Sequence, residues 1–182
     1  MYALDACALI ALFNDEPGAD IVEAMLNACE AHEIIIRMNA IQVLEVYYDR
    51  IGKVGQIIAN KFLVTLYGSN IIVDCLILDP MITQAGKYKT TYDISLADAV
   101  CLASAATLGV TVITSDHTEF DPVEEAEHFP FLWIRPKPEP KPKKKKVDVN
   151  AIIAERDQAV RALAEAKLRI AGLEATLSGT DC

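Results

Sequence analysis

The chain has 182 residues, 52% of them hydrophobic, and a formal net charge of −9 at pH 7. This length suits one domain with an appendage, and the hydrophobic content argues against global disorder. No apolar run approaches the roughly 20 residues that cross a bilayer, and the N-terminus lacks the basic segment of a signal peptide. We therefore expect no association with membranes.

Short apolar runs alternate with segments that carry apolar residues at helical spacing. In chain order the sequence predicts a strand at 2–4, helices at 6–13 and 19–32, a strand at 33–38, helices at 39–51 and 54–67, a strand at 71–73, helices from 79 and at 95–108, and strands at 110–114 and 131–134. Asn39 is the expected N-cap of its helix, and Asp79 is expected to begin another by a cap followed by proline. Gly52 and Gly109 are expected to end helices.

The apolar strands predict a mostly parallel sheet covered by helices on both faces, an α/β fold with three α/β/α layers. Right-handed crossovers place the carboxyl ends of all strands at one edge, where such sheets bind ligands. Asp5 and Asp116 both directly follow strands, so we expect both at that edge.

The composition changes after residue 134, which predicts a domain at 1–134, a Pro/Lys-rich linker at 135–147 and a helical segment at 148–178. The helical segment repeats apolar residues at alternating spacings of three and four, which predicts a weak coiled coil. Residues 1–134 hold 6 lysines and arginines against 19 acids, whereas residues 135–182 hold 11 against 7. The body repels phosphate backbones, so action on nucleic acid needs a metal, a basic patch or the tail.

Four carboxylates stand out because no lysine or arginine lies within two residues of any of them: Asp5, Glu45, Asp98 and Asp116. Two carboxylates ~4 Å apart repel by roughly 4 kcal/mol at an effective dielectric near 20, so a cluster of them calls for a cation. Oxygen ligands suit Mg²⁺ or Mn²⁺.

Each acid also has a structural explanation. Asp5 is a possible helix cap, Asp116 a turn residue, and Asp98 the third residue of a capping box after Ser95. Glu45 is harder to explain because its helix is apolar on nearly every face.

The sequence gives little support for a zinc site, a cysteine or serine nucleophile, or a nucleotide-binding site. The five scattered cysteines, with no CxxC pair, indicate free thiols in a reducing cytoplasm and no zinc site. No histidine is placed to activate Cys7, and His117 is expected in a turn. Phosphate-binding glycine motifs and a nucleophile elbow are absent. A phosphatase or receiver-like protein is also disfavoured, because Asp5 is followed by alanine and cysteine.

Four segments together resemble the PIN domain, most closely the VapC-type toxins of toxin–antitoxin pairs. They are Tyr2–Leu9, Asn39–Tyr47, Ile94–Ala99 and Thr114–Asp121. The resemblance covers residues 1–134 and implies an endoribonuclease dependent on Mg²⁺ or Mn²⁺ that leaves 5′-phosphate and 3′-hydroxyl ends.

The resemblance also implies a set of site residues and partners. Asp5, Asp98 and Asp116 would hold the metal, and Glu45 would complete the site or orient the attacking water. Thr114 and Ser115 would line the pocket, with Asp121 as a further candidate. The implied partners are an RNA such as tRNA or rRNA, a small antitoxin, and a second copy in a homodimer.

The sequence departs from the family pattern at Ala6, where a threonine or serine is usual, and the lysine-rich linker and heptad segment are additions. The alternative function is therefore a weak or inactive PIN-like interaction module that oligomerises through its C-terminal helix. The lysine run serves either as a solubilising spacer or in RNA binding, and the sequence favours neither.

Overall fold

The computed structural model describes residues 1–139 and, further along, residues 153–154, 156–158, 160–161 and 163. The chain divides into two compact units, Met1–Pro138 and Glu139–Cys182. The described residues from 153 onward are helical. The predicted coiled coil and the linker after residue 139 otherwise lie outside the described residues, so the predicted domain boundaries stay predictions. No helix among the described residues is long and apolar enough to cross a membrane.

The first unit contains five strands and seven helices within the described residues. In chain order they are β1 (Tyr2–Leu4), α1 (Ala6–Phe13), α2 (Ala19–Glu30), β2 (Ile36–Asn39), α3 (Ala40–Val54), α4 (Gln56–Tyr67), β3 (Ile72–Asp74), α5 (Asp79–Thr91), α6 (Leu96–Leu108), β4 (Thr111–Thr114), α7 (His117–Glu127) and β5 (Phe131–Trp133).

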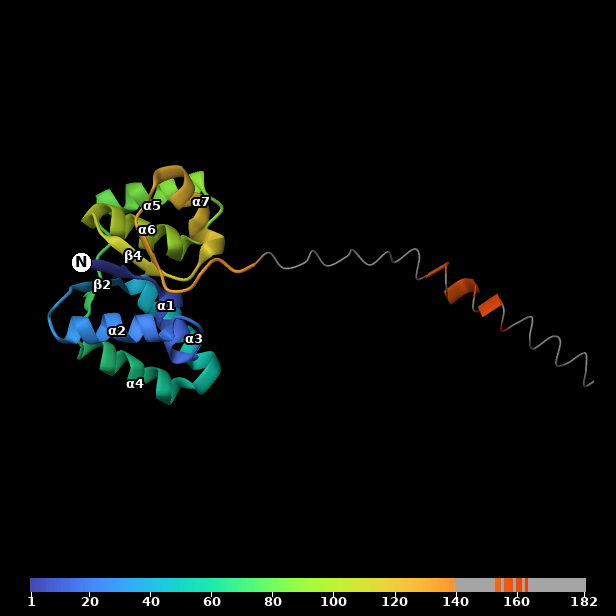
Figure 1. The fold of residues 1–182 in the computed structure, drawn as a ribbon, viewed down its shortest axis with the longest axis horizontal. Helices are drawn as coiled ribbons and strands as arrows, with labels where there is room; N and C mark the ends of the chain where they lie inside the picture. Colours follow the sequence, from blue (N-terminus) through green and yellow to red (C-terminus); the bar gives the residue numbers. More distant parts are fainter. Residues whose placement is uncertain (140–152, 155, 159, 162, 164–182) are drawn as a thin grey trace, which may run out of the picture. The chain divides into compact units, whose positions relative to one another are not determined.

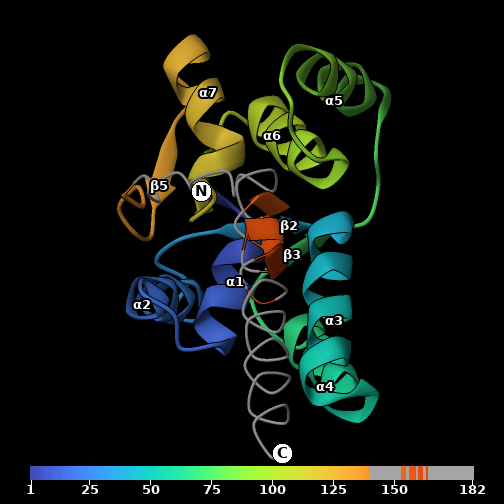
Figure 2. The ribbon, with the colours of Figure 1, turned by 90° about the vertical axis from the view of Figure 1, so that its right-hand side faces the viewer.

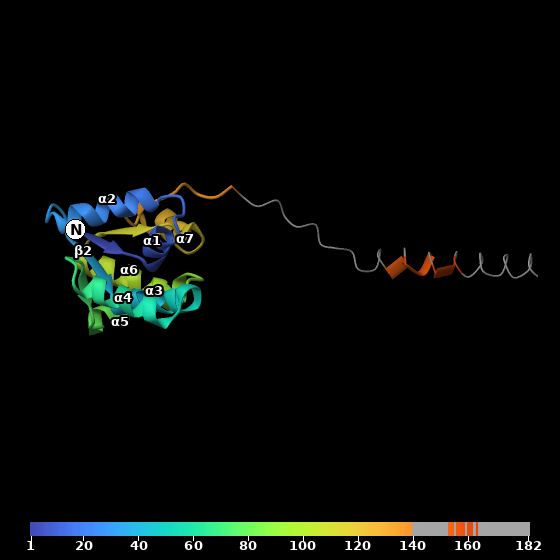
Figure 3. The ribbon, with the colours of Figure 1, turned by 90° about the horizontal axis from the view of Figure 1, so that it is seen from below.

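All five strands pair in parallel, in the order β3-β2-β1-β4-β5. Figure 3 shows the arrows of β1 and β4 side by side and pointing the same way. The central position of β1 puts the first residues of the chain next to a strand formed more than a hundred residues later. The predicted α/β fold with a parallel sheet is confirmed.

Helices cover both faces of the sheet (Figures 1 and 2). Neighbouring strand residues alternate between two cores: Ala3 and Val112 face α5, α6 and α7, whereas Leu4 and Ile113 face α1 to α4. Burial on both faces explains why the strands read as continuous apolar runs. The sheet thereby becomes a rigid platform whose carboxyl edge carries the starts of α1, α3 and α7.

The structure corrects three of the predicted boundaries and adds one helix. The strand predicted at 33–38 begins only at Ile36, because the amides of Glu33 and Ile34 close the end of α2 by bonding to the Ala28 carbonyl. Helix α3 also passes through Gly52 and ends at Gly55, whose φ of +80° favours glycine.

The other two corrections concern helices α5 and α7. Leu78 is the N-cap of α5, so Asp79 lies inside the first turn. Helix α7 was not predicted, because Pro122 lies inside it and the segment is rich in acids. Burial of Phe120 and Val123 against the sheet stabilises it despite that proline.

Candidate metal centre

Asp5 lies at the carboxyl end of the central strand and is only 2% exposed. It occupies the N-cap position of α1, but its side chain caps no amide. Its Oδ2 instead accepts hydrogen bonds from the Thr114 hydroxyl at 2.7 Å and from the Cys7 thiol at 2.7 Å. The explanation of Asp5 as a helix cap is therefore wrong. A buried carboxylate aimed across to the next strand needs another reason.

Asp116 follows β4 on the neighbouring strand and caps α7. Its Oδ1 accepts from the amides of Thr118 at 3.0 Å and Glu119 at 3.1 Å. Its own amide donates to the Thr114 hydroxyl at 3.1 Å, so one threonine links the ends of β1 and β4. As the strand directions require, Asp5 and Asp116 share one edge of the sheet.

Asp98 sits in the first turn of α6, where Ser95 is the N-cap. The Ser95 hydroxyl accepts from the Asp98 amide at 3.0 Å and donates to the Asp98 carboxylate at 2.5 Å. The predicted capping box is only half formed, because the Ser95 amide donates to Glu119 of α7 at 2.9 Å. The Asp98 carboxylate therefore bonds to the Ser95 hydroxyl but not to the Ser95 amide.

Glu45 lies in the second turn of α3 and is half-buried, with the Tyr48 hydroxyl donating to its Oε1 at 3.4 Å. The expectation of a helix embedded in the core is wrong, because Leu44 is 54% and Tyr48 57% exposed. Val43 and Val46 face the core, whereas Glu45 lies between them and the exposed Leu44 and Tyr48 and so borders solvent.

The four acids interact through their charges. Burial, Asp98 and Glu45 raise the pKa of Asp5 to about 7, outweighing the hydrogen bonds from Cys7 and Thr114. Burial and Asp98 likewise raise the pKa of Glu45. Burial raises the pKa of Asp98, and so do Glu119 and Asp116, against the hydrogen bond from Ser95. The structure thus places acids from four helices near enough to one another for their charges to interact.

Glu119 is a fifth acid at this place that the sequence argument did not select. It reaches across from the first turn of α7 to the start of α6 and adds negative charge beside Asp98. It lies three positions after Asp116 in the chain, which is the one sequence signal for its position. Glutamate in the first turn of a helix is common, so that signal alone is weak.

Buried polar contacts fix the position of the acidic edge. Gln42 is 0% exposed, accepts from the Ala6 amide at 2.8 Å and donates to the Ala97 carbonyl at 2.8 Å. It thus ties the residues that adjoin Asp5 and Asp98 to α3. The Cys7 thiol accepts from the amide of Ser115 at 3.2 Å. Burial and Asp5 raise the pKa of Cys7, so the thiol stays protonated and acts as a hydrogen-bond donor to that carboxylate.

The donor set fits a hard divalent cation in charge and chemistry, because carboxylates are the ligands such a cation prefers, and burial together with the charges of Asp98 and Glu45 raises the pKa of Asp5. The acids do not form a complete metal site as they stand. In the part of the chain that the structure describes, no three histidine, cysteine, aspartate or glutamate side chains have the spacing of a metal site.

A cavity of about 340 Å³ opens beside Asp116. The first turn of α1 contributes Cys7 to it, and the residues after β4 contribute Ser115 and Asp116. The chain after β5 contributes Arg135 and Pro136. Thr114 lies beneath, fully buried, so only Ser115 of the predicted pair lines the space.

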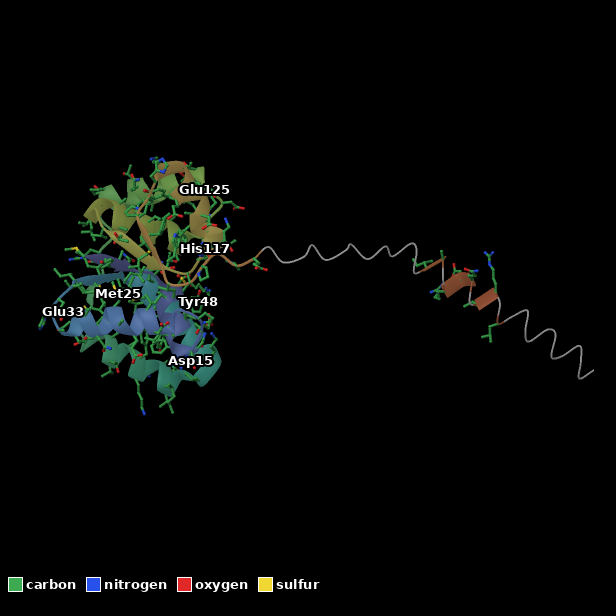
Figure 4. The ribbon with its side chains drawn as sticks, in the orientation of Figure 1. Asp15, Met25, Glu33, Tyr48, His117 and Glu125 are labelled. Carbon is green, nitrogen blue, oxygen red and sulfur yellow. The ribbon has the colours of Figure 1, made fainter. Side chains whose placement is uncertain are left out.

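The chain after β5 is held in place by His117. The His117 ring stacks on Trp133, and its Nε2 lies 3.0 Å from the Arg135 carbonyl. Its Nδ1 lies 2.7 Å from Asp121, which also pairs with Lys137. Figure 4 shows His117 on the side of the unit where this segment departs. Asp121 therefore helps to hold the segment after β5 through its contacts with His117 and Lys137. His117 is the first residue of helix α7, whereas the sequence predicted a turn there.

The sequence profile of the PIN domain matches residues 2–125. The chain belongs to the PIN domain family. No curated protein matches it.

Solved structures share the fold of this PIN domain at low sequence identity. One chain of a toxin–antitoxin complex from Klebsiella pneumoniae is 16% identical, with a TM-score of 0.56, and the match covers 75% of this chain and 100% of that one. VapBC-1 from nontypeable Haemophilus influenzae is 19% identical, with a TM-score of 0.55 and coverage of 73% and 97%. VapC20 from Mycobacterium tuberculosis, described as a toxin that cleaves the sarcin–ricin loop, is 14% identical, with a TM-score of 0.55 and coverage of 68% and 95%.

Proposed function

We propose that this PIN domain is a metal-dependent endoribonuclease of the VapC toxin kind. The observation that carries the proposal is Asp5, a buried carboxylate at the end of the central strand whose pKa is raised to about 7 by burial and by Asp98 and Glu45. A residue that opposes folding in this way is retained where a ligand compensates for it. The family and the fold shared with VapC proteins support nuclease activity.

Each acid has a role in this proposal. Asp5, Asp98 and Asp116 hold Mg²⁺ or Mn²⁺, and Glu45 completes the site or orients the attacking water. When bound, the ion supplies a Lewis acid that neutralises charge on the phosphodiester. Thr114 and Cys7 hold Oδ2 of Asp5 by donating to it. Asp116 is fixed by the amides at the start of α7, where the helix dipole favours negative charge.

The proposed substrate is RNA, because VapC20 is described as cleaving the sarcin–ricin loop. The proposed inhibitor is an antitoxin, because the similar structures include toxin–antitoxin complexes. Homodimer formation and a cytoplasmic location are also proposed. Free thiols at Cys7, Cys29, Cys75 and Cys101 suit a reducing compartment.

The test measures cleavage of RNA with Mg²⁺ or Mn²⁺, and Mn²⁺ binding by calorimetry. The variants Asp5→Asn and Asp98→Asn are expected to lose cleavage and to bind Mn²⁺ far more weakly. The matched control is Glu125→Gln, an exposed acid of α7 whose loss removes the same charge and is expected to change neither measurement (Figure 4). Wild-type protein that binds no divalent cation would exclude the proposal.

A non-enzymatic interaction module is the second candidate, favoured by the incompletely closed acid cluster and by Ala6 where the family usually has a hydroxyl residue. It predicts no cleavage by the wild-type protein in any divalent cation. It also predicts loss of oligomers when residues 135–182 are deleted, which sedimentation would measure.

A further inference from the structure

A second cavity, of about 390 Å³, lies at the end of the sheet formed by β2 and β3. The connection from β3 to α5, which Figure 2 shows leaving the sheet, lines one side of it, and the C-terminal half of α6 lines another. None of Asp5, Glu45, Asp98 and Asp116 lines this space. It is therefore a candidate site separate from the metal centre.

Polar side chains line this cavity from the sheet. In β2, Ile36 and Met38 belong to the core that α1 to α4 cover, so the alternation along the strand turns Arg37 to the opposite face. The guanidinium of Arg37 pairs there with Asp74 of β3: its Nε donates to Oδ2 at 2.9 Å, and its Nη2 donates to Oδ1. Within residues 1–139, no hydrogen bond engages the third guanidinium nitrogen, Nη1. Arg37 thus has donors left for a ligand.

Ser104 brings a second donor to the cavity from α6. The residue lines the cavity and is only 4% exposed, yet its hydroxyl has no hydrogen-bond partner among the described residues. Thr107, which follows it in the same helix, differs because its hydroxyl donates to the Ala103 carbonyl at 2.7 Å. A buried hydroxyl without a partner costs free energy, so a ligand that offers an acceptor to Ser104 is favoured.

Apolar side chains supply most of the remaining lining, among them Leu76, Leu78, Met81 and Leu108. Met81 is buried, whereas Leu76 and Leu78 are 71% and 61% exposed. These two leucines lie on the connection from β3 to α5, and an apolar group in the cavity removes part of their surface from water, which favours binding. A lining of this kind, with a few polar groups and this volume, is typical of a site for a small organic molecule.

The charges around the cavity favour a neutral ligand. Asp74 compensates the charge of Arg37, so the pair carries no net charge. Residues 1–134 hold 19 acids against 6 lysines and arginines, and this excess repels an approaching anion. A cation is disfavoured because the unused groups of Arg37 and Ser104 are hydrogen-bond donors. They suit an uncharged acceptor such as a carbonyl oxygen.

We propose that this cavity binds a small neutral molecule that has an apolar body and a carbonyl oxygen. The carbonyl oxygen accepts hydrogen bonds from the Ser104 hydroxyl and from Nη1 of Arg37, and the apolar body packs against Met81 and Leu78. Binding here is independent of the proposed nuclease activity, because the two sites share no residue.

The test titrates the full chain with prodan, a neutral naphthyl ketone whose fluorescence brightens and shifts to the blue in apolar surroundings. The wild-type protein is expected to bind it. The variant Ser104→Ala removes only the hydroxyl and is expected to weaken binding roughly 3- to 10-fold, as the loss of one neutral hydrogen bond does.

Two tryptophan variants and one thiol show whether prodan binds in this cavity. Thr107→Trp places a large side chain on the cavity wall and is expected to abolish binding. Thr90→Trp is the matched control and is expected to bind like wild type. Thr90 is also an exposed helix residue, its hydroxyl also donates to the carbonyl four positions earlier, and it lies outside the cavity. Cys75 is exposed and lines the cavity, so saturating prodan is expected to slow its alkylation by iodoacetamide, measured by mass spectrometry.

Absence of prodan binding by the wild-type protein would overturn the inference, and so would wild-type affinity in Ser104→Ala or in Thr107→Trp. Unchanged alkylation of Cys75 would place the bound probe elsewhere and overturn it as well. Binding of anilinonaphthalene sulfonate, an anionic naphthalene, without binding of prodan would refute the neutral class of ligand. A dimer in sedimentation that Thr107→Trp dissociates, with no prodan bound, would assign the cavity to contacts between copies of the chain instead.

Discussion

The charge state of Asp5 gives a prediction that separates a metal ligand from a structural acid. The pKa of Asp5 rises from 3.8 to about 7 in the folded protein because of burial, Asp98 and Glu45. Between about pH 4 and 7 the folded state keeps a proton that the unfolded chain has lost, so stability falls as the pH rises through this window. At 1.36 kcal/mol per pKa unit, the loss reaches about 4 kcal/mol above pH 7.

The variant Asp5→Asn stays neutral at every pH and can still accept the Thr114 hydrogen bond. Without metal it is expected to be more stable than wild type by up to about 4 kcal/mol near pH 8, or roughly 10 °C in Tm, and equally stable near pH 4. Urea unfolding followed by circular dichroism in EDTA measures this difference. Added Mn²⁺ is expected to stabilise the wild-type protein by about 2.7 kcal/mol at a hundred times its Kd, but not Asp5→Asn.

Asp121 provides a control, because its pKa is shifted in the opposite direction from that of Asp5. Burial tends to raise the pKa of Asp121, but hydrogen bonds from Lys137 and His117 outweigh it and lower the pKa overall. Asp121→Asn should therefore lose stability near pH 7, and the loss should vanish as the pH falls through the lowered pKa. Identical pH profiles for wild type and Asp5→Asn, or equal Mn²⁺ stabilisation of both, would refute the account of Asp5.

Three further predictions concern the residues that hold the site. Gln42→Leu leaves the buried Ala6 amide without a partner, removes a donor to the Ala97 carbonyl, and is expected to cost about 1–3 kcal/mol in urea unfolding; an unchanged stability would contradict it. Thr114→Val removes a donor to Asp5 and is expected to weaken Mn²⁺ binding in calorimetry, whereas Thr114→Ser should restore it. Gly18→Ala forces a side chain onto the Ile134 carbonyl at a φ of +92°, and a loss of about 2–4 kcal/mol is expected by thermal unfolding.

Strand direction made part of the site predictable. Asp5 and Asp116 each follow a buried apolar strand, and parallel pairing of β1 with β4 leaves them only one edge to occupy. Ser95 and Gly109 bound α6 as expected because capping is a local property. These inferences depend on neighbours within a few residues, which a sequence displays directly.

Properties that depend on contacts between distant residues could not be predicted from the sequence. The surroundings of Glu45 were misjudged because Leu44 and Tyr48 are apolar yet exposed, and composition does not say which face of a helix meets solvent. Glu119 was overlooked because its role depends on α7 lying beside the start of α6. The assignment of Asp5, Glu45, Asp98 and Asp116 as metal ligands stays a prediction.

The pairing of the first strand with the fourth has a consequence for the protein during its synthesis. Asp5 leaves the ribosome early, but its amide bonds to Ile113 and its carboxylate to Thr114. A nascent chain that lacks β4 therefore has no assembled acidic edge. The topology thus delays formation of this edge until nearly the whole first unit has emerged.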